Sequence, residues 1–259
     1  MPTNSVEMQQ EYQRLFDTCK IKVDKYPLVD AAIDKIVANR AKYEAVSKRT
    51  GVPWYFIAIV HTMEGGGKFN THLHNGDPLT AKTVQVPKNR PATGSPPFTW
   101  EDSAFDALIL RKLDKISNWT VPELLYQFEG YNGFGYRVKG INSPYLWSFT
   151  NQYTKGKYTA DGIYDPNAVS KQIGTAAFLR RMAEKQIVVT GDVDPISRIK
   201  SLGSNVVYNP KKYDEKAKEL QQLLSNVGQP LKADGFAGTN TSDAFFRVTG
   251  SYLKGDKRP

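Results

Sequence analysis

One short segment restricts how this chain can fold more than any other. Residues 54–60 read Trp-Tyr-Phe-Ile-Ala-Ile-Val and follow Pro53. Proline is tolerated in the first turn of a helix, and a helix that is apolar on nearly all sides has to be buried. Three consecutive glycines at residues 65–67 cannot sustain that helix. We therefore expect a buried helix that carries Glu64 in its last turn.

The rest of the chain predicts a mainly α fold with long loops. Residues 69–98 are rich in Pro, Asn, Gly and Thr, so we expect loops there with a small β-hairpin near residues 83–86. Thr99 can cap the helix that follows it, and Gly130 is expected to break a later one. Apolar residues recur at helical spacing over residues 26–50, 100–113, 122–128 and 168–188.

Turn residues divide the chain into two parts. Polar and turn-forming residues follow an apolar run at residues 187–189, and a leucine-rich helical face appears later, around Leu223. We expect a helical catalytic domain over residues 1–190, a linker over 191–205 and a small helical module over 206–259. A module of this size is near the lower limit of independent stability.

Composition limits the classes of function. The 259 residues carry a formal net charge of +9, which favours an anionic partner. No segment approaches the roughly 20 apolar residues of a membrane span, and the polar start lacks the pattern of a secretory signal. The single Cys19 excludes an internal disulfide framework.

Glu64 is the first candidate for chemistry. A carboxyl at the C-terminal end of an apolar helix is expected to have a raised pKa, as a general acid needs. Glycosidases pair such an acid with a second carboxylate, and Asp77 in a polar turn is the best candidate for it. Thr83 lies six positions later and could help to hold a water.

Two further sets of polar residues suggest sites. His61, His72 and His74 all lie within fourteen residues, so they could form a metal site with Glu64 and Asp77. We favour the alternative that the three histidines are hydrogen-bonded within the protein and shape a cleft. Downstream, carboxylate, amide and aromatic groups beside glycine suit stacking on sugar rings. The candidate substrate-binding residues are His74, Asn75, Glu129, Tyr131, Asn132, Tyr136, Tyr145 and Trp147.

Several of these motifs resemble the phage and bacterial lysozyme-like (endolysin) family of the lysozyme superfamily. The resemblance covers about residues 45–185 and rests on Val52-Pro53-Trp54-Tyr55 through Glu64, Thr71-His72-Leu73-His74-Asn75-Gly76-Asp77-Pro78-Leu79, Phe98-Thr99-Trp100-Glu101, Tyr131-Asn132-Gly133-Phe134-Gly135-Tyr136, Ser143-Pro144-Tyr145-Leu146-Trp147-Ser148 and Lys155-Gly156-Lys157-Tyr158. It implies a lysozyme-like helical fold with Glu64 as the catalytic acid.

The resemblance also extends to other candidate site residues. Tyr131-Asn132 is similar to the cleft-lining tyrosine-asparagine pair of goose-type lysozymes and lytic transglycosylases, and Asp77 with Thr83 is similar to the aspartate and threonine of phage-type lysozymes. The thirteen-residue interval from Glu64 to Asp77, and Gly65 in place of a serine, depart from the phage-type pattern.

The C-terminal part contains Leu220-Gln221-Gln222-Leu223-Leu224, then Gly228, and then Asp234-Gly235-Phe236-Ala237-Gly238 with Thr241 and Ala244. These residues resemble the leucine-glutamine helix and glycine turn of a peptidoglycan-binding domain. The residues expected to bind the wall are Leu223, Asp234, Gly235, Gly238 and Thr241.

The sequence thus predicts an N-acetylmuramidase that cleaves the bond between N-acetylmuramic acid and N-acetylglucosamine. The alternatives are a lytic transglycosylase with the same acid, a metal-dependent wall amidase or peptidase, and a non-catalytic wall-binding or virion protein. We expect a monomer without cofactor or bound metal. Its expected partner is bacterial peptidoglycan, with anionic wall polymers as a further candidate, and we expect neither nucleic-acid binding nor membrane insertion. Because no secretory signal is recognised, we expect synthesis in a host cytoplasm followed by action on the wall. Both an endolysin and a virion-associated lysin fit this expectation.

Overall fold

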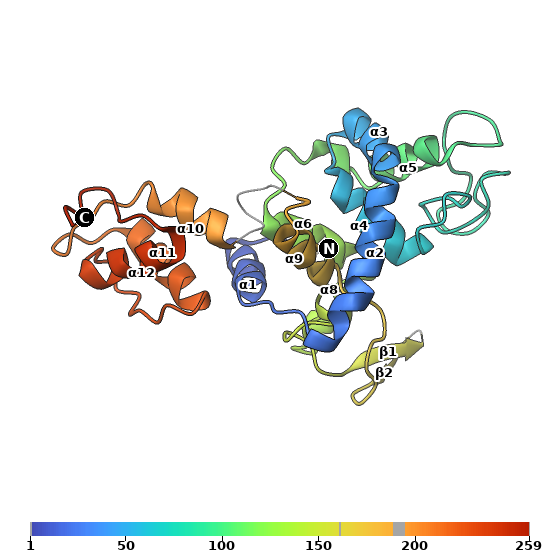
Figure 1. Cartoon of the computed structure of the whole chain (residues 1–259). Helices are drawn as coiled ribbons and strands as arrows, with labels where there is room; N and C mark the ends of the chain where they lie inside the picture. The colour runs from blue at the N-terminus through green and yellow to red at the C-terminus, as the bar shows by residue number, and fades with distance from the viewer. Residues whose placement is uncertain (1, 161, 189–194, 259) are drawn as a thin grey trace.

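The chain folds around two separate hydrophobic cores. The computed structural model describes residues 2–160, 162–188 and 195–258. The larger core is built from residues between Tyr12 and Val188, and the smaller from residues between Ile199 and Leu253. Figure 1 shows the two lobes, with the C-terminus in the smaller one. The prediction of a mainly α protein is confirmed.

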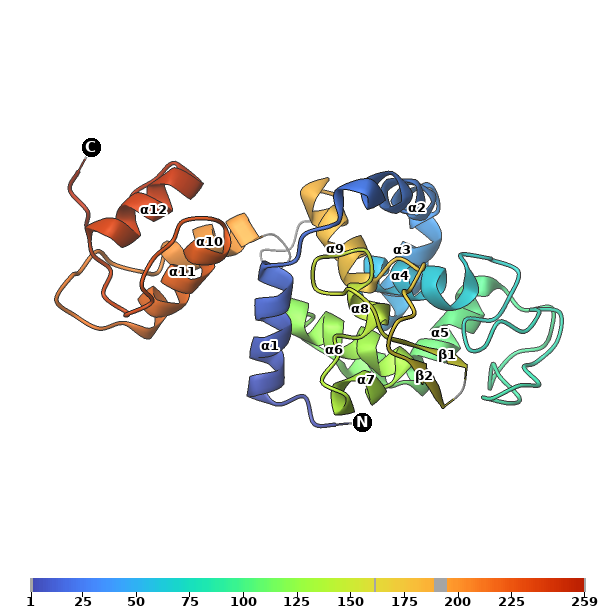
Figure 2. The ribbon, with the colours of Figure 1, turned by 90° about the horizontal axis from the view of Figure 1, so that it is seen from below.

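The larger lobe contains most of the helices. Seen from below, α6, α7 and α8 lie between α1 and the hairpin β1–β2 (Figure 2). The elements are α1 (Val6–Asp17), the 3-10 helix η1 (Val23–Lys25), α2 (Tyr26–Ala38), α3 (Arg40–Thr50), α4 (Trp54–Gly65), α5 (Trp100–Leu110), the 3-10 helix η2 (Leu113–Lys115), α6 (Val121–Asn132), α7 (Gly135–Val138), α8 (Pro144–Trp147), β1 (Lys157–Ala160), β2 (Ile163–Asp165) and α9 (Thr175–Glu184).

Helix α4 is the buried helix that the sequence predicts. Every residue from Tyr55 to His61 is buried, and α2, α3 and α9 pack against it. The helix stops where Gly66 takes the left-handed conformation at φ 58°, which a glycine adopts without a steric cost. Glu64 therefore lies in the last turn, as predicted.

Helices α8 and α9 approach each other at a glycine. The backbone N–H of Gly174, the residue before α9, donates to the carbonyl oxygen of Ser148 at 3.1 Å. A Cβ at position 174 would lie 2.3 Å from the carbonyl oxygen of Leu146. Only glycine allows this approach, which fixes α8 against the core.

Two expectations about local structure are wrong. Helix α6 continues through Gly130 to Asn132, because its apolar face packs in the core. Residues 83–86 form no strand, since the backbone N–H groups of Val84 and Gln85 donate to the carboxylate of Asp77. The small antiparallel sheet is instead formed by β1 and β2.

The smaller lobe consists of α10 (Pro195–Gly203), α11 (Glu215–Asn226) and α12 (Thr239–Thr249), which pack on one another. The predicted linker therefore contains a helix of the module, with Ile199 buried in the smaller core; residues 191–194 lie outside the described residues. Arg198 connects the lobes, with nitrogen–oxygen distances of 3.3 Å to Asp17 and 2.5 Å to Glu219.

Over the described ranges, no helix has both the length and the apolar character needed to cross a membrane.

We predict that Gly174→Ala lowers the free energy of unfolding by about 1–3 kcal/mol, because the added methyl group forces α8 and α9 apart. Urea unfolding measures the change. Gly135→Ala is the matched control, since a Cβ there meets only the Tyr158 hydroxyl at 3.9 Å. Equal stability of the two variants would contradict the close approach of α8 and α9.

Candidate active site

Glu64 lies exposed at the end of α4, at the edge of the larger core. Its carboxylate oxygen Oε1 accepts a hydrogen bond of 2.6 Å from the hydroxyl of Tyr145 in α8. The side-chain amide of Gln172 donates to the carbonyl oxygen of Met63 at 3.2 Å, next to this position. Residues far apart in the sequence thus hold the end of α4 and one oxygen of its carboxylate.

The surroundings of Tyr145 hold it as a hydrogen-bond donor to Glu64. Its side chain is only 8% exposed and belongs to the larger core. Burial first, and then the negative charge of Glu64, raise the pKa of Tyr145 well above its ordinary value. The phenol therefore keeps its proton and serves as a fixed donor to the carboxylate.

Tyr131 and Arg111 complete the surroundings of Glu64. Tyr131 lies near the end of α6, and the guanidinium carbon of Arg111 lies 3.8 Å from the centroid of its ring. Burial raises the pKa of the Tyr131 hydroxyl; the positive charge of Arg111 opposes this rise, and the carboxylate of Glu64 adds to it. No sequence pattern points to Arg111, because it lies twenty positions before Tyr131.

Asp77, the predicted second carboxylate, organises the loop that follows α4. Its Oδ2 accepts hydrogen bonds from the backbone N–H groups of Val84 (2.8 Å) and Gln85 (3.1 Å) and from the side chain of Asn75 (3.1 Å). The bonds from Gln85 and Val84 are the main causes that lower the pKa of Asp77. The carboxylate stays ionised, but one of its oxygens is committed to the loop.

Thr83, predicted to hold a water, has a buried side chain that is 1% exposed. Its hydroxyl donates to the carbonyl oxygen of Pro87 at 2.5 Å and accepts from the backbone N–H of Arg90 at 2.9 Å. Both interactions lie within its own loop, so we place Thr83 among the groups that hold the loop rather than among the catalytic ones.

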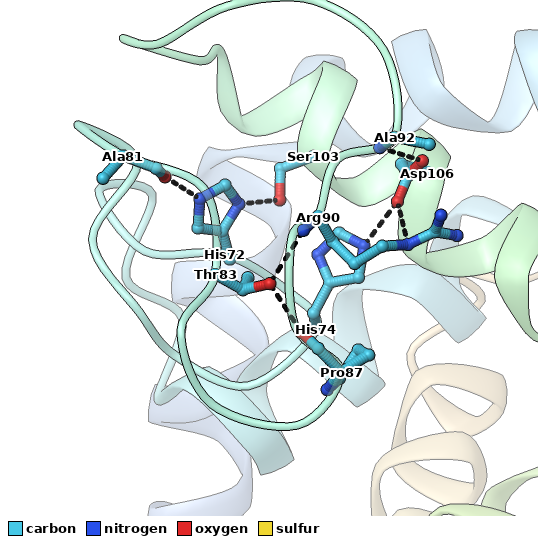
Figure 3. A network of polar contacts seen from close by, with 9 residues as sticks. All are labelled: His72, His74, Ala81, Thr83, Pro87, Arg90, Ala92, Ser103 and Asp106. Atoms are coloured by element: carbon cyan, nitrogen blue, oxygen red, sulfur yellow. Dashed lines mark hydrogen bonds and ion pairs between the residues drawn. The ribbon is translucent and has the colours of Figure 1, made fainter.

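Two histidines fasten the same loop to α5, as Figure 3 shows. The Nδ1 atom of His72 lies 2.7 Å from the hydroxyl of Ser103, and its Nε2 lies 2.8 Å from the carbonyl oxygen of Ala81. The Nε2 atom of His74 lies 2.8 Å from a carboxylate oxygen of Asp106. His74, predicted to bind substrate, therefore has a completely buried side chain that serves the loop.

The third histidine also has partners of its own. The ring of His61 bonds the hydroxyl of Tyr43 and the carbonyl oxygen of Lys68. Within the described ranges, no three or more His, Cys, Asp or Glu side chains are grouped so that they could hold a metal ion. The three histidines thus act separately, as polar groups that shape the loop.

Glu129 and Trp147, two of the predicted sugar contacts, lie away from Glu64. The carboxylate of Glu129 is 2% exposed and accepts from the hydroxyl of Tyr12 and from Arg137. Both residues line a cavity of about 210 Å³ whose lining includes neither Glu64 nor Tyr145. Trp147 is 1% exposed, so we place it in the core rather than on a sugar-binding surface.

The remaining predicted contacts differ in exposure. Asn132 is exposed at the end of α6, one residue after Tyr131. Tyr136 is buried, and its hydroxyl accepts from the backbone N–H of Tyr158. Asn75 is bound to Asp77 within the loop. Of the predicted substrate-binding residues, Tyr131 and Asn132 thus lie at the end of α6, and Tyr145 lies in α8.

In the smaller lobe, the buried Gln221 holds the predicted wall-binding turn. Its side chain donates to Asp234 and Thr241 and accepts from the backbone N–H of Gly235. Asp234, Gly238 and Thr241 line a cavity of about 200 Å³. Leu223 does not, because it lies in the smaller core.

Comparison of the chain with protein-family models, with curated proteins and with solved structures finds no match. The functional argument therefore depends on the residues of the site itself.

We predict that the protein loses stability as the pH falls below about 6.5. Burial lowers the pKa of His61 and of His74 in the folded state. Near pH 6.5 the unfolded chain binds more protons at these histidines than the folded chain does, so stability rises with pH across this interval.

The measurement is the thermal midpoint between about pH 5.5 and 7.5, compared between the wild type and His74→Gln. The variant should have the smaller pH dependence, because one depressed histidine is gone. An identical slope in both proteins would show that His74 is not kept neutral by the fold.

Proposed function

We propose that this protein cleaves the glycan strand of bacterial peptidoglycan, with Glu64 as the general acid. The observation that carries the proposal is the exposed carboxylate at the end of the buried α4, held at 2.6 Å by the buried Tyr145 hydroxyl. An oriented carboxyl on a rigid element is what protonation of a glycosidic oxygen needs. The sequence resemblance to lysozyme-like proteins supports the bond between N-acetylmuramic acid and N-acetylglucosamine as the target.

In this mechanism Tyr145 fixes one carboxyl oxygen of Glu64, and the other delivers the proton to the leaving oxygen. The bond between the anomeric carbon and that oxygen breaks as positive charge develops on the sugar ring. Tyr131 and the exposed Asn132, at the end of α6, are suited to contact the sugar and its acetamido group. Tyr145 is a positioning residue, because it acts on the reaction through Glu64.

A lytic transglycosylase is a second candidate, and the loop favours it. A hydrolase needs a second carboxylate to activate water or stabilise charge. Three N–H donors converge on Oδ2 of Asp77, and the hydroxyl of Thr83 is closed inside the loop. In a transglycosylase the muramyl 6-hydroxyl attacks the anomeric carbon instead of water. Glu64 then accepts the proton of that hydroxyl after giving its own to the leaving oxygen.

The smaller lobe is proposed to bind the wall. Its cavity gathers amide, carboxylate and hydroxyl groups from α11, from the turn that follows it and from the start of α12, including Gln221, Asp234 and Thr241. Such groups can bond the hydroxyl and amide groups of glycan and peptide. Attachment of this lobe would keep the catalytic lobe near its insoluble substrate.

We predict that Glu64→Gln lowers the rate of glycan release from purified peptidoglycan by about 10²–10⁴-fold, because the amide cannot supply a proton. The rate is followed as turbidity loss, with and without EDTA, and the fragments are identified by mass spectrometry. Reducing muramyl ends indicate a hydrolase, and anhydromuramyl ends indicate a transglycosylase.

Full lysis by a folded Glu64→Gln variant would refute the proposal. If EDTA also stopped that lysis, a metal-dependent amidase or peptidase would take its place. Absence of activity in the wild type would support a non-catalytic wall-binding protein.

We predict that Tyr145→Phe lowers kcat by about 10-fold or more and changes KM little, because a hydrogen bond to a charged group contributes about 1.5–3 kcal/mol. Steady-state kinetics on soluble glycan strands measure both constants. Tyr126→Phe is the control, since that hydroxyl donates only to the backbone oxygen of Pro2. Similar kcat values for both variants would argue against the positioning role.

A further inference from the structure

Arg111 differs from every other arginine that lies over an aromatic ring in the described part of the chain. Each of the others also pairs with a carboxylate or a backbone oxygen: Arg40 with Glu44, Arg49 with Asp102, Arg137 with Glu11 and Glu129, Arg180 with the carbonyl of Phe16, Arg181 with Asp30, and Arg258 with Asp256. Among the described residues, Arg111 has the ring contact and neither an ion pair nor a side-chain hydrogen bond.

The ring contact holds Arg111 in place. Its guanidinium carbon lies 3.8 Å from the centroid of Tyr131, a shorter distance than that of any other arginine over a ring in the same part of the chain. Attraction to the ring face orders the side chain without using its N–H donors. The guanidinium of Arg111 therefore presents ordered N–H donors that are not in use, and a pair of them matches the two oxygens of a carboxylate.

Arg111 is also close to the catalytic candidate. Its positive charge acts on the hydroxyls of both Tyr131 and Tyr145, and the negative charge of Glu64 acts on the same two groups. Tyr145 in turn bonds Glu64 directly. The charges of Arg111 and Glu64 are therefore exerted on the same two tyrosines, one of which Arg111 contacts through its ring while the other bonds Glu64.

We propose that Arg111 forms a carboxylate-binding subsite beside Glu64, which selects glycans with an acidic substituent next to the cleaved bond. The inference rests on the proposed glycan-cleaving function. In peptidoglycan two sources supply such a carboxylate. One is the lactyl group of an unsubstituted muramyl residue, and the other is the stem peptide that is joined to that group. A neutral N-acetylated glycan offers neither.

The test measures binding of soluble glycan strands to Glu64→Gln, in which the acid is removed and the strand remains intact. Three strands are compared: with stem peptides, without peptides but with free lactyl carboxylates, and without peptides after conversion of those carboxylates to methylamides. Each is titrated against Glu64→Gln alone, with added Arg111→Gln, and with added Arg49→Gln. Arg49 is the matched control, because it lies 4.3 Å over the ring of Phe105 and is already paired with Asp102.

We expect Arg111→Gln to weaken binding of the acidic strands about 10-fold, as loss of a charge-assisted pair implies, and to leave the methylamide strand unchanged. Arg49→Gln should change none of the three. Weakening only with the peptide-free acidic strand identifies the lactyl carboxylate as the partner, because a stem peptide occupies that carboxyl group. Weakening only with the peptide-bearing strand identifies the stem peptide, and weakening with both shows that the subsite accepts either carboxylate.

Two results would overturn the subsite. If Glu64→Gln binds all three strands with equal affinity and Arg111→Gln has no effect, Arg111 binds no carboxylate, while the glycan-cleaving function is untouched. If Glu64→Gln binds no strand although its thermal midpoint equals that of the wild type, both the subsite and the proposed function fail.

Discussion

The burial of α4 is the constraint on which the larger lobe depends. A helix with apolar residues on all sides is stable in water only when other helices enclose it, and α2, α3 and α9 do so. The enclosed helix ends where Gly66 takes the left-handed conformation and turns the chain away. Glu64 lies at that end, exposed but attached to a helix whose residues from Tyr55 to His61 are all buried. The same packing that stabilises the fold therefore gives the carboxylate a rigid base.

The groups around Glu64 come from elements that the core holds independently. Tyr145 belongs to α8, which packs on α6 and α9. The close contact at Gly174 fixes the position of α8 relative to α9. Tyr131 ends α6, and Arg111 caps α5. The loop after α4 is fastened to α5 by His72 and His74 (Figure 3). The carboxylate of Asp77 orders the same loop internally. A site of this kind is preorganised, since no single loop decides the position of the acid.

Local chemistry was enough to predict some of these features. The apolar run after Pro53 and the glycines after Glu64 predict α4 and its end, and Thr99 caps α5 as expected through a hydrogen bond from Asp102. Other features depend on contacts across long sequence distances. Gly130 stays helical because α6 is packed in the core, and the backbone N–H groups of Val84 and Gln85 bond Asp77 instead of a neighbouring strand. The positions of Glu129 and Trp147 at a cavity that Glu64 does not line, and of Arg111 over Tyr131, follow from helix packing that no local pattern encodes.

The most direct test of the central claim is a crystal structure of Glu64→Gln with a bound peptidoglycan glycan fragment, in which the distance from the side chain at position 64 to the glycosidic oxygen is measured. The account predicts that a nitrogen or oxygen atom of this side chain lies within about 2.6–3.2 Å of that oxygen, with the sugar bordered by Tyr131. A glycan bound only elsewhere, such as in the cavity beside Glu129, would contradict the assignment of Glu64 as the acid.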